Sequence, residues 1–127
     1  MKLEYLPAGS LDCPLVRLYD FDTSEAVKLR DVVYQLCNWS VDTIAIHDLP
    51  FVEPVDSCRL TMRVSKRNHG VSVLLAPSTL VCALSQCYWD NVVGLIEPFC
   101  EIRAEHGYQW LDDSGDISLL LSPSGDW

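Results

Sequence analysis

Residues 57–85 read SCRLTMRVSKRNHGVSVLLAPSTLVCALS, and they carry the most regular pattern of the 127-residue chain. Apolar side chains occupy every second position of the first part: Cys58, Leu60, Met62 and Val64. Because a β-strand sends successive side chains to opposite faces, this spacing predicts a strand with one buried face. The alternation resumes after the turn at 66–70 and again after Pro77 and Ser78. The stretch therefore predicts an antiparallel meander of three strands, with one dry face and one wetter face.

Two amphipathic helices are predicted on either side of the meander along the chain. The first begins near Asp22 and Glu25, which have the spacing of a capping box. Its apolar side chains recur every three or four residues, which predicts one buried stripe: Ala26, Leu29, Val33, Leu36 and Cys37. The second follows Ser85 as its N-cap and has a similar stripe: Tyr88, Val92, Leu95, Ile96 and Phe99. Pro98 lacks an N–H, so this helix should end or kink about one turn earlier.

Further strands are predicted around these elements. They cover residues 2–6, 15–21 and 43–47, and a hairpin is expected around the acidic turn 112–116. This order of strands and helices predicts a single globular α+β domain, 1–127. We expect a two-layer sandwich, in which a mainly antiparallel sheet of about six to eight strands carries two helices packed on one face.

The composition indicates a folded, soluble protein. Hydrophobic residues make up 49% of the chain and charged residues 21%, which is enough apolar material for a core and too little charge for a disordered chain. No apolar run reaches the roughly 18 residues that a membrane-spanning helix needs. Residues 1–7 have an early acid and lack the apolar segment of a signal peptide. We therefore expect a cytoplasmic protein that does not act at a membrane.

Charge is unevenly distributed along the chain. Acids number 18 and bases 9, which gives a formal net charge of −9. This disfavours nucleic-acid binding, because that binding depends on Lys and Arg replacing phosphate counterions. Four of the bases lie in the first meander strand and its turn: Arg59, Arg63, Lys66 and Arg67. An acidic body with a small basic patch suits a protein that meets a basic partner. The alternative is an ordinary solvated surface with internal ion pairs.

Six cysteines raise the question of disulfides or a metal site: Cys13, Cys37, Cys58, Cys82, Cys87 and Cys100. Cys58 and Cys82 fall on the apolar phase of strands, where a free cysteine behaves as a small buried hydrophobe. Together with the missing export signal, this predicts reduced core thiols. The chain has no C-x-x-C pair, its histidines lack metal-ligand spacing, and the turn 112–116 lacks the pattern of a calcium loop. We expect neither a metal nor another cofactor.

Cys87 is the candidate for catalysis. It lies in the first turn of the second predicted helix, where backbone N–H groups and the helix dipole favour a thiolate. Such a thiolate would be a nucleophile or a redox sensor, although no partner base is identifiable. The alternative is a half-buried thiol beside Tyr88 and Trp89. His47 precedes Asp48 at a strand end, but adjacent strand residues point apart, so the two are not expected to form a dyad.

The wetter face of the meander is the candidate binding surface. Arg59, Thr61 and Arg63 share this face, which could accept an acidic or aromatic partner or a second copy of the chain. Trp89 and Trp110 add aromatic side chains of the kind that anchor interfaces. The alternative is a sheet with one ordinary solvated side.

The first functional hypothesis is a non-catalytic protein–protein interaction module. It would bind a protein partner or associate with itself as a homodimer, and an immunity- or antitoxin-like role fits an acidic chain without catalytic motifs. The alternative is a thiol-dependent enzyme or redox sensor that uses Cys87. A third hypothesis is a binder of a small ligand in a pocket between helix and sheet.

The two ends of the chain resemble those of short bacterial proteins to which no function is assigned. The resemblance rests on residues 3–7, 12–15 and 17–21 at the start, and on residues 119–125 with Trp127 at the end. It implies no activity, cofactor or site residue.

Overall fold

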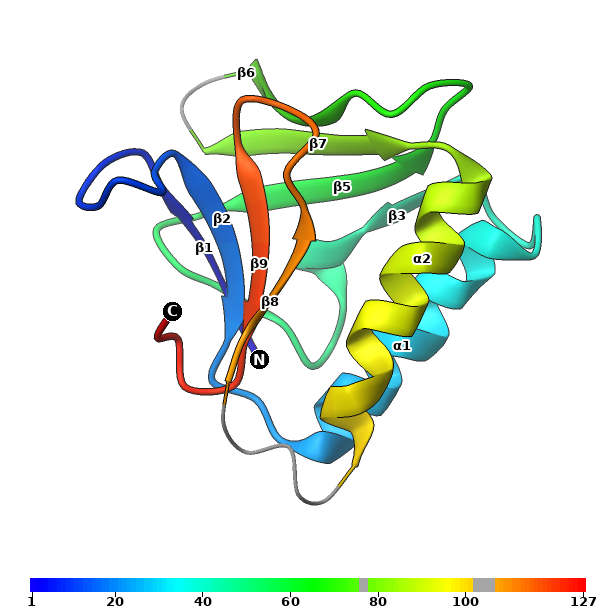
Figure 1. Ribbon diagram of the computed structural model, residues 1–127, viewed down its shortest axis with the longest axis horizontal. Helices are drawn as coiled ribbons and strands as arrows, with labels where there is room; N and C mark the ends of the chain where they lie inside the picture. Colours follow the sequence, from blue (N-terminus) through cyan, green and yellow to red (C-terminus); the bar gives the residue numbers. More distant parts are fainter. Residues whose placement is uncertain (76–77, 102–106) are drawn as a thin grey trace.

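The computed structural model of the protein describes residues 1–75, 78–101 and 107–127 (Figure 1). The expected break at Pro77 and the histidine His106 lie outside the described residues. The elements are, in chain order, β1 (Lys2–Leu6), β2 (Leu15–Tyr19), α1 (Thr23–Cys37), β3 (Thr43–Ala45), the 3-10 helix η1 (Ile46–Asp48), β4 (Glu53–Pro54), β5 (Arg59–Val64), β6 (Gly70–Leu75), β7 (Thr79–Leu84), α2 (Gln86–Ile96), the 3-10 helix η2 (Glu97–Cys100), β8 (Gln109–Asp112) and β9 (Ser118–Ser122).

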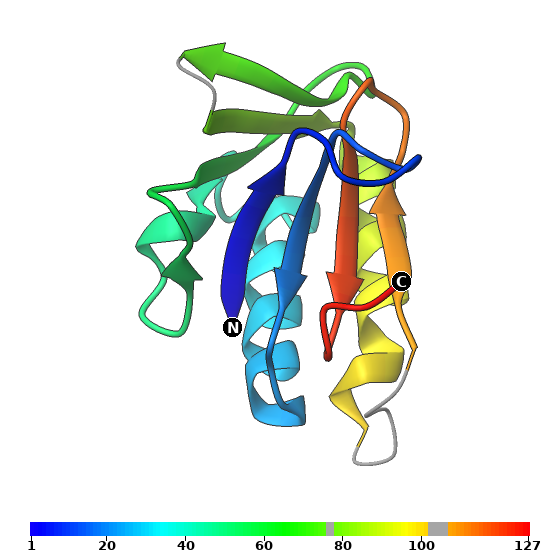
Figure 2. The ribbon, with the colours of Figure 1, turned by 90° about the vertical axis from the view of Figure 1, so that its left-hand side faces the viewer.

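These strands form two sheets. Sheet A has the strand order β4-β1-β2-β9-β8, and sheet B has the order β3-β5-β7-β6. In Figure 2, sheet A stands in front of α1 and α2, and sheet B closes the upper end of the molecule. The α+β class is confirmed, but the expected two-layer sandwich with a single sheet of about six to eight strands is wrong. A period-two pattern shows which side of a strand is buried, and it does not show which strands are neighbours.

The stretch 57–85 forms three strands as predicted, but they are not a meander. β7 lies between β5 and β6, parallel to β5 and antiparallel to β6. The connection from β5 to β6 crosses the end of β7 and bonds to it. Ser65 N donates to Leu84 O at 2.8 Å, and Asn68 Oδ1 accepts from Ser85 N at 2.8 Å. These bonds hold the connection where it passes the end of β7. In a meander, a tight hairpin would instead join β5 to β6 as direct neighbours.

The predicted buried phase of the stretch is confirmed in β5 and β7, but in β7 the phase predicted to be wetter is buried as well, since Val81 and Ala83 are only 9% and 3% exposed. The inward side chains are at most 1% exposed: Leu60, Met62, Leu80, Cys82 and Leu84. They join side chains of sheet A and of both helices in one core. In β6 only Val71 follows the prediction, because Val73 and Leu75 are 47% and 72% exposed. β6 is an edge strand, and its second half reaches beyond the core.

Both helices begin where the sequence predicts, and they lie side by side (Figures 1 and 2). Glu25 N donates to Asp22 Oδ1 and Asp22 N donates to Glu25 Oε1, which is the predicted capping box. Ser85 Oγ accepts from Tyr88 N at the start of α2. The buried side of α1 is the predicted one: Ala26, Leu29, Val33 and Leu36. In α2 the buried side is displaced, since Trp89 is buried and Tyr88 is 37% exposed.

The C-terminal segment 123–127 lies against the outer face of sheet A. Arg17 Nη1 donates to Gly125 O at 2.9 Å, and Trp127 Nε1 donates to Asp12 Oδ2 at 2.9 Å. Leu120, the register partner of Arg17, is buried although it lies outside the main core cluster. The outer face of sheet A is therefore occupied by the protein's own chain.

Candidate functional site

The outer face of sheet B carries the three predicted binding residues of β5. Arg59 and Arg63 are exposed, and Thr61 is half-buried between them. Register partners lie on the same face of a sheet, so short side chains of β3 and β7 lie beside Thr61. This surface, the basic face, consists of Thr43, Ala45, Arg59, Thr61, Arg63, Ser72, Thr79, Val81 and Ala83.

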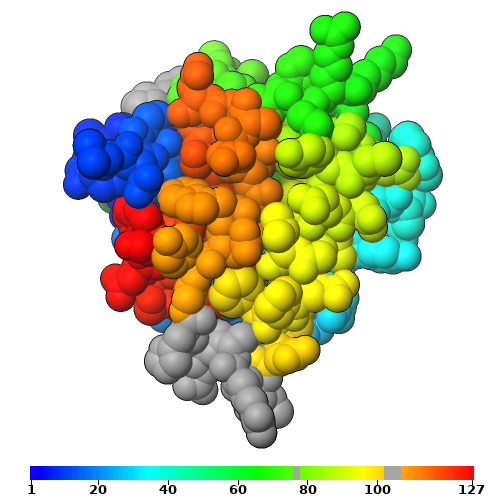
Figure 3. Space-filling view, viewed as in Figure 1, coloured from blue at the N-terminus to red at the C-terminus, as the bar shows by residue number. Residues whose placement is uncertain are grey.

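The bases of this region have no ionic partner within the described residues. No carboxylate there lies within 4.0 Å of Arg59, Arg63, Lys66 or Arg67. Other bases do pair with acids: Lys2 with Asp20, Arg17 with Glu4, and Arg30 with Asp31. The connection 65–69, which carries Lys66 and Arg67, projects from the surface at the upper right of Figure 3. Among the described residues, positive charge is therefore gathered without paired acids at one end of an acidic protein.

A pocket of about 340 Å³ opens at the edge of the basic face, beside the start of β5. Its lining contains five side chains that can donate, accept or titrate, together with one proline: His47, Asp48, Pro54, Ser57, Cys58 and Arg59. Arg59 belongs to both the pocket and the basic face. The two features therefore form one continuous candidate site.

His47 is held in this pocket by the backbone of β5. β3 ends at Ala45 and the chain turns into η1, so on the β3 side β5 has no neighbouring strand at Leu60. The His47 imidazole takes that place, because its Nδ1 lies 3.1 Å from both Leu60 N and Leu60 O. When Nδ1 accepts from Leu60 N–H, Nε2 carries the proton of the neutral ring. The sequence carried no signal for this bond, because it joins residues from separate elements.

His47 and Asp48 do not diverge as two strand residues would. The expectation of a strand through His47 is wrong, since both residues lie in η1. His47 Nε2 lies 3.7 Å from Asp48 Oδ2, at the margin of an ion pair. The His47 side chain is only 8% exposed and that of Asp48 is 70% exposed. The imidazole is therefore held in place, and the carboxylate is an exposed group at the rim of the pocket.

Cys58 does not supply a nucleophile to the pocket. The residue is 1% exposed. Burial, and after it the charge of Glu4, raise the pKa of the Cys58 thiol from 9.0 to about 11. Near neutral pH the group is a thiol, whereas nucleophiles and metal ligands are thiolates. The pocket thus offers hydrogen-bond donors and charge, and it lacks an activated cysteine.

Cys87 lies elsewhere, on the exposed side of the first turn of α2. It lines a second pocket, of about 270 Å³, together with Cys37, Gln86 and Asp90. Gln86 Nε2 donates to Cys37 O, which ties the two helix ends together. Burial, and after it Asp90, raise the pKa of the Cys37 thiol. Within the described part of the chain this pocket has no histidine that could act as a base for Cys87.

The two tryptophans of the predicted binding set do not join the basic face. Trp89 is fully buried, and its Nε1 donates to Arg63 O at 2.9 Å. It therefore belongs to the core and supports the backbone of β5 from within. Trp110 is half-buried on β8 of sheet A, edge-to-face with Tyr108 at a centroid distance of 6.3 Å. Of the five predicted binding residues, only the three on β5 lie together.

Within the described ranges, 1–75, 78–101 and 107–127, no three His, Cys, Asp or Glu side chains are placed to hold a metal ion. The acidic turn after β8 instead bonds to itself, with Asp112 Oδ1 accepting from Ser114 Oγ at 2.7 Å. None of the helices there has the length and apolar character needed to cross a lipid bilayer.

No family model, curated protein or solved structure matches the chain. The function is therefore inferred from the geometry of the basic face and the pocket beside it.

Proposed function

We propose that this protein is a non-catalytic interaction module that binds another protein through the basic face of sheet B. One observation carries the proposal: Arg59 and Arg63 are exposed on the outer face of sheet B, with no described carboxylate within 4.0 Å of either. An unpaired guanidinium presents a planar fork of donors that suits a carboxylate. Neutralisation of a partner protein, as an immunity protein or antitoxin performs it, is one role of this kind.

The shape and charge of the basic face favour an acidic partner. Arg59 and Arg63 are four residues apart on one strand, which separates their Cα atoms by about 13 Å. The side chains between them and on β7 are short: Thr61, Val81 and Ala83. Two exposed guanidinium groups at this spacing suit a segment that carries two carboxylates. The chain's net charge of −9 would orient such a partner, since this end gathers four bases of an otherwise acidic protein.

The test compares two variants with the same change of charge. Arg59→Glu/Arg63→Glu reverses the basic face, and Lys2→Glu/Lys28→Glu reverses two bases elsewhere. Each protein is used as bait in the cells that express it, and captured proteins are cross-linked and quantified by mass spectrometry. We expect a partner that the wild type and the Lys2/Lys28 control capture and the arginine variant loses. Identical capture by all three proteins would refute the proposal.

A second candidate function is a thiol-dependent enzyme or redox sensor that uses Cys87. The observation that favours it is the exposed Cys87 thiol in one pocket with Cys37. Alkylation by iodoacetamide separates the two candidates, because a reactive thiolate is labelled much faster than an ordinary exposed thiol. Labelling of Cys87 at the rate of cysteine in an unstructured peptide would support the interaction module, and labelling at least tenfold faster would support the thiol function.

A further inference from the structure

We infer that the pocket bounded by His47, Ser57 and Arg59 binds a carboxylate, which an acidic side chain of the docked protein supplies. The inference rests on the proposed function and names one contact within it. The pocket and the basic face share Arg59, so a partner lying on the face reaches the pocket without leaving the surface.

Three residues with donor groups line the pocket: His47, Ser57 and Arg59. The Arg59 guanidinium has no described acid within 4.0 Å. The Ser57 hydroxyl makes no hydrogen bond within the described residues. The His47 ring is fixed by Leu60, and its Nε2 faces only the exposed Asp48, at 3.7 Å. Guanidinium, hydroxyl and imidazole N–H are donors that a carboxylate accepts.

The chemistry of the lining favours a singly charged carboxylate over other ligands. The raised pKa of Cys58 keeps it a thiol, so the pocket has no thiolate for a soft metal ion. Asp48 at the rim adds one negative charge, which opposes a doubly charged phosphate more strongly than a carboxylate. The volume of about 340 Å³ accommodates the end of one Asp or Glu side chain.

The predicted ligand therefore has two acidic groups with a defined spacing. One carboxylate occupies the pocket at Arg59, and the other meets Arg63, about 13 Å further along β5. Both arginines hold their charge at any relevant pH, so binding should weaken as salt rises.

The test uses two small probes and needs no knowledge of the partner. N-acetyl-glutamate and N-acetyl-glutamine are titrated into the isotope-labelled full chain up to high millimolar concentration. We expect saturable shifts of the His47 side chain and of the Ser57 and Arg59 amides with the glutamate probe alone. No saturable shift, or equal shifts with both probes, would overturn the inference. This comparison needs no variant, so it stands even where a substitution unfolds the protein.

Three substitutions locate the contact. Arg59→Gln should weaken binding of N-acetyl-glutamate about tenfold, which corresponds to the loss of one charge-assisted bond. His47→Asn keeps a side-chain acceptor near the position of Nδ1 and removes Nε2, so it should weaken binding while Leu60 keeps its partner. Asp48→Asn removes the competing carboxylate and should strengthen binding. Binding unchanged by all three variants contradicts the assigned pocket.

Different experimental results would refute the interaction module and the carboxylate pocket. A partner lost by Arg59→Glu/Arg63→Glu and fully retained by His47→Asn and Arg59→Gln would leave the interaction module standing and refute the carboxylate pocket. Binding of the glutamate probe together with unaltered capture by the arginine variant would refute the interaction module.

Discussion

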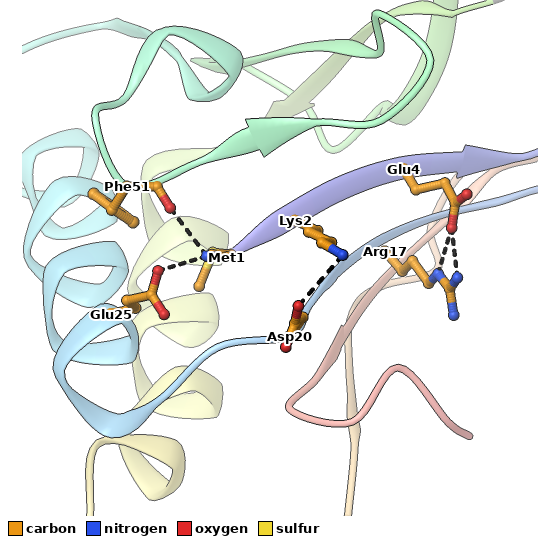
Figure 4. Close-up of polar contacts among 7 residues, drawn as sticks. All are labelled: Met1, Lys2, Glu4, Arg17, Asp20, Glu25 and Phe51. Atoms are coloured by element: carbon orange, nitrogen blue, oxygen red, sulfur yellow. Dashed lines mark hydrogen bonds and ion pairs between the residues drawn. The ribbon is translucent and has the colours of Figure 1, made fainter.

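Glu4 and Arg17 face each other in direct register across β1 and β2, and both Nε and Nη2 of Arg17 donate to Glu4 Oε1, at 2.8 and 2.5 Å (Figure 4). The guanidinium also stacks on Tyr19 at 3.9 Å and holds Gly125 O. The Arg17 side chain is 20% exposed and the Glu4 side chain is 18% exposed. Arg17 thus joins a cross-strand ion pair to the C-terminal segment. A partly buried network of this kind should contribute more to the free energy of unfolding than an exposed ion pair does.

Arg17→Ala should lower the free energy of unfolding by about 1–2 kcal/mol, between the values for exposed and fully buried pairs. Urea unfolding measures the loss. The matched control is Arg30→Ala, which removes an ion pair with the exposed Asp31 and should leave stability nearly unchanged. Equal losses in the two variants would contradict the role given to Arg17.

Glu25 has two functions that substitution can separate. It completes the capping box of α1 and accepts from the Met1 ammonium group at 2.5 Å (Figure 4). Because Gln also completes a capping box, Glu25→Gln removes mainly the charge and should cost about 1–3 kcal/mol. Glu25→Ala should cost about 1 kcal/mol more, since the cap is lost as well. Thermal and urea unfolding of both variants check this order, and a Gln variant as stable as the wild type would show that the ammonium contact contributes nothing.

Stability should fall at alkaline pH. The folded pKa of Cys58 is raised from 9.0 to about 11, so the folded protein holds this proton more tightly than the unfolded chain. The contribution is fully present below pH 9.0 and is lost as the pH rises through about 11. Burial, and after it Asp112, raise the pKa of Cys82 in the same direction. Unfolding free energies measured over this interval should fall less steeply in Cys58→Ala than in the wild type, and equal slopes would exclude a contribution from Cys58.

An introduced carboxylate should unfold the protein on one face of β5 and be tolerated on the other face. Leu60→Asp places an unpaired acid at a fully buried position, at a cost of several kcal/mol against a total stability of about 5–15 kcal/mol. Thr61→Asp, the next residue, places the same acid on the basic face between two arginines. Cooperative unfolding and recovery in the soluble fraction should be lost in the first variant and kept in the second. A cooperatively folded Leu60→Asp protein would mean that the strand faces are misassigned.

Replacing glycine by alanine should have opposite effects on stability at two positions. Gly70 lies where two backbone segments approach closely, and Gly94 lies at an open position of a helix. Gly70 has a φ of +73°, and a Cβ there would lie 2.5 Å from Gly115 N. Gly70→Ala should therefore destabilise the protein by about 2 kcal/mol or more, since strain and overlap add. Gly94→Ala, within α2 with nothing within 4 Å of the added Cβ, should stabilise it by about 0.5–1 kcal/mol. Differential scanning calorimetry should move the two melting temperatures in opposite directions.

Local signals predicted the local structure well. The capping box at Asp22 and Glu25 and the cap at Ser85 determine where the helices begin, and both depend on neighbours three residues away. The buried phases of β5 and β7 follow from period two for the same reason. In α2 the apolar pattern permitted more than one buried side, and packing in the core selected Trp89 over Tyr88.

These local sequence patterns did not predict the long-range structure. The insertion of β7 between β5 and β6 depends on bonds from the connection 65–69 to the end of β7, which no spacing in the sequence indicates. The same holds for the His47 pocket, because it forms only when η1 and the start of β5 meet. The three β5 residues of the candidate site, Arg59, Thr61 and Arg63, were predictable from the pattern of a single strand. The pocket beside them was not.

The bond between His47 and Leu60 has a consequence for self-assembly. An unpaired strand edge is a template for another chain, and proteins that cover such edges resist aggregation. The Nδ1 of His47 accepts from Leu60 N–H, so β5 is closed to an incoming strand at this position, and the outer edge on this side of sheet B is the short strand β3 (Thr43–Ala45). At the opposite border, β6 is bridged to Ile117 at Val71, and the apolar side chains of Val73, Leu74 and Leu75 are exposed. Fibril or domain-swap contacts, if they form, should therefore begin at Val73–Leu75.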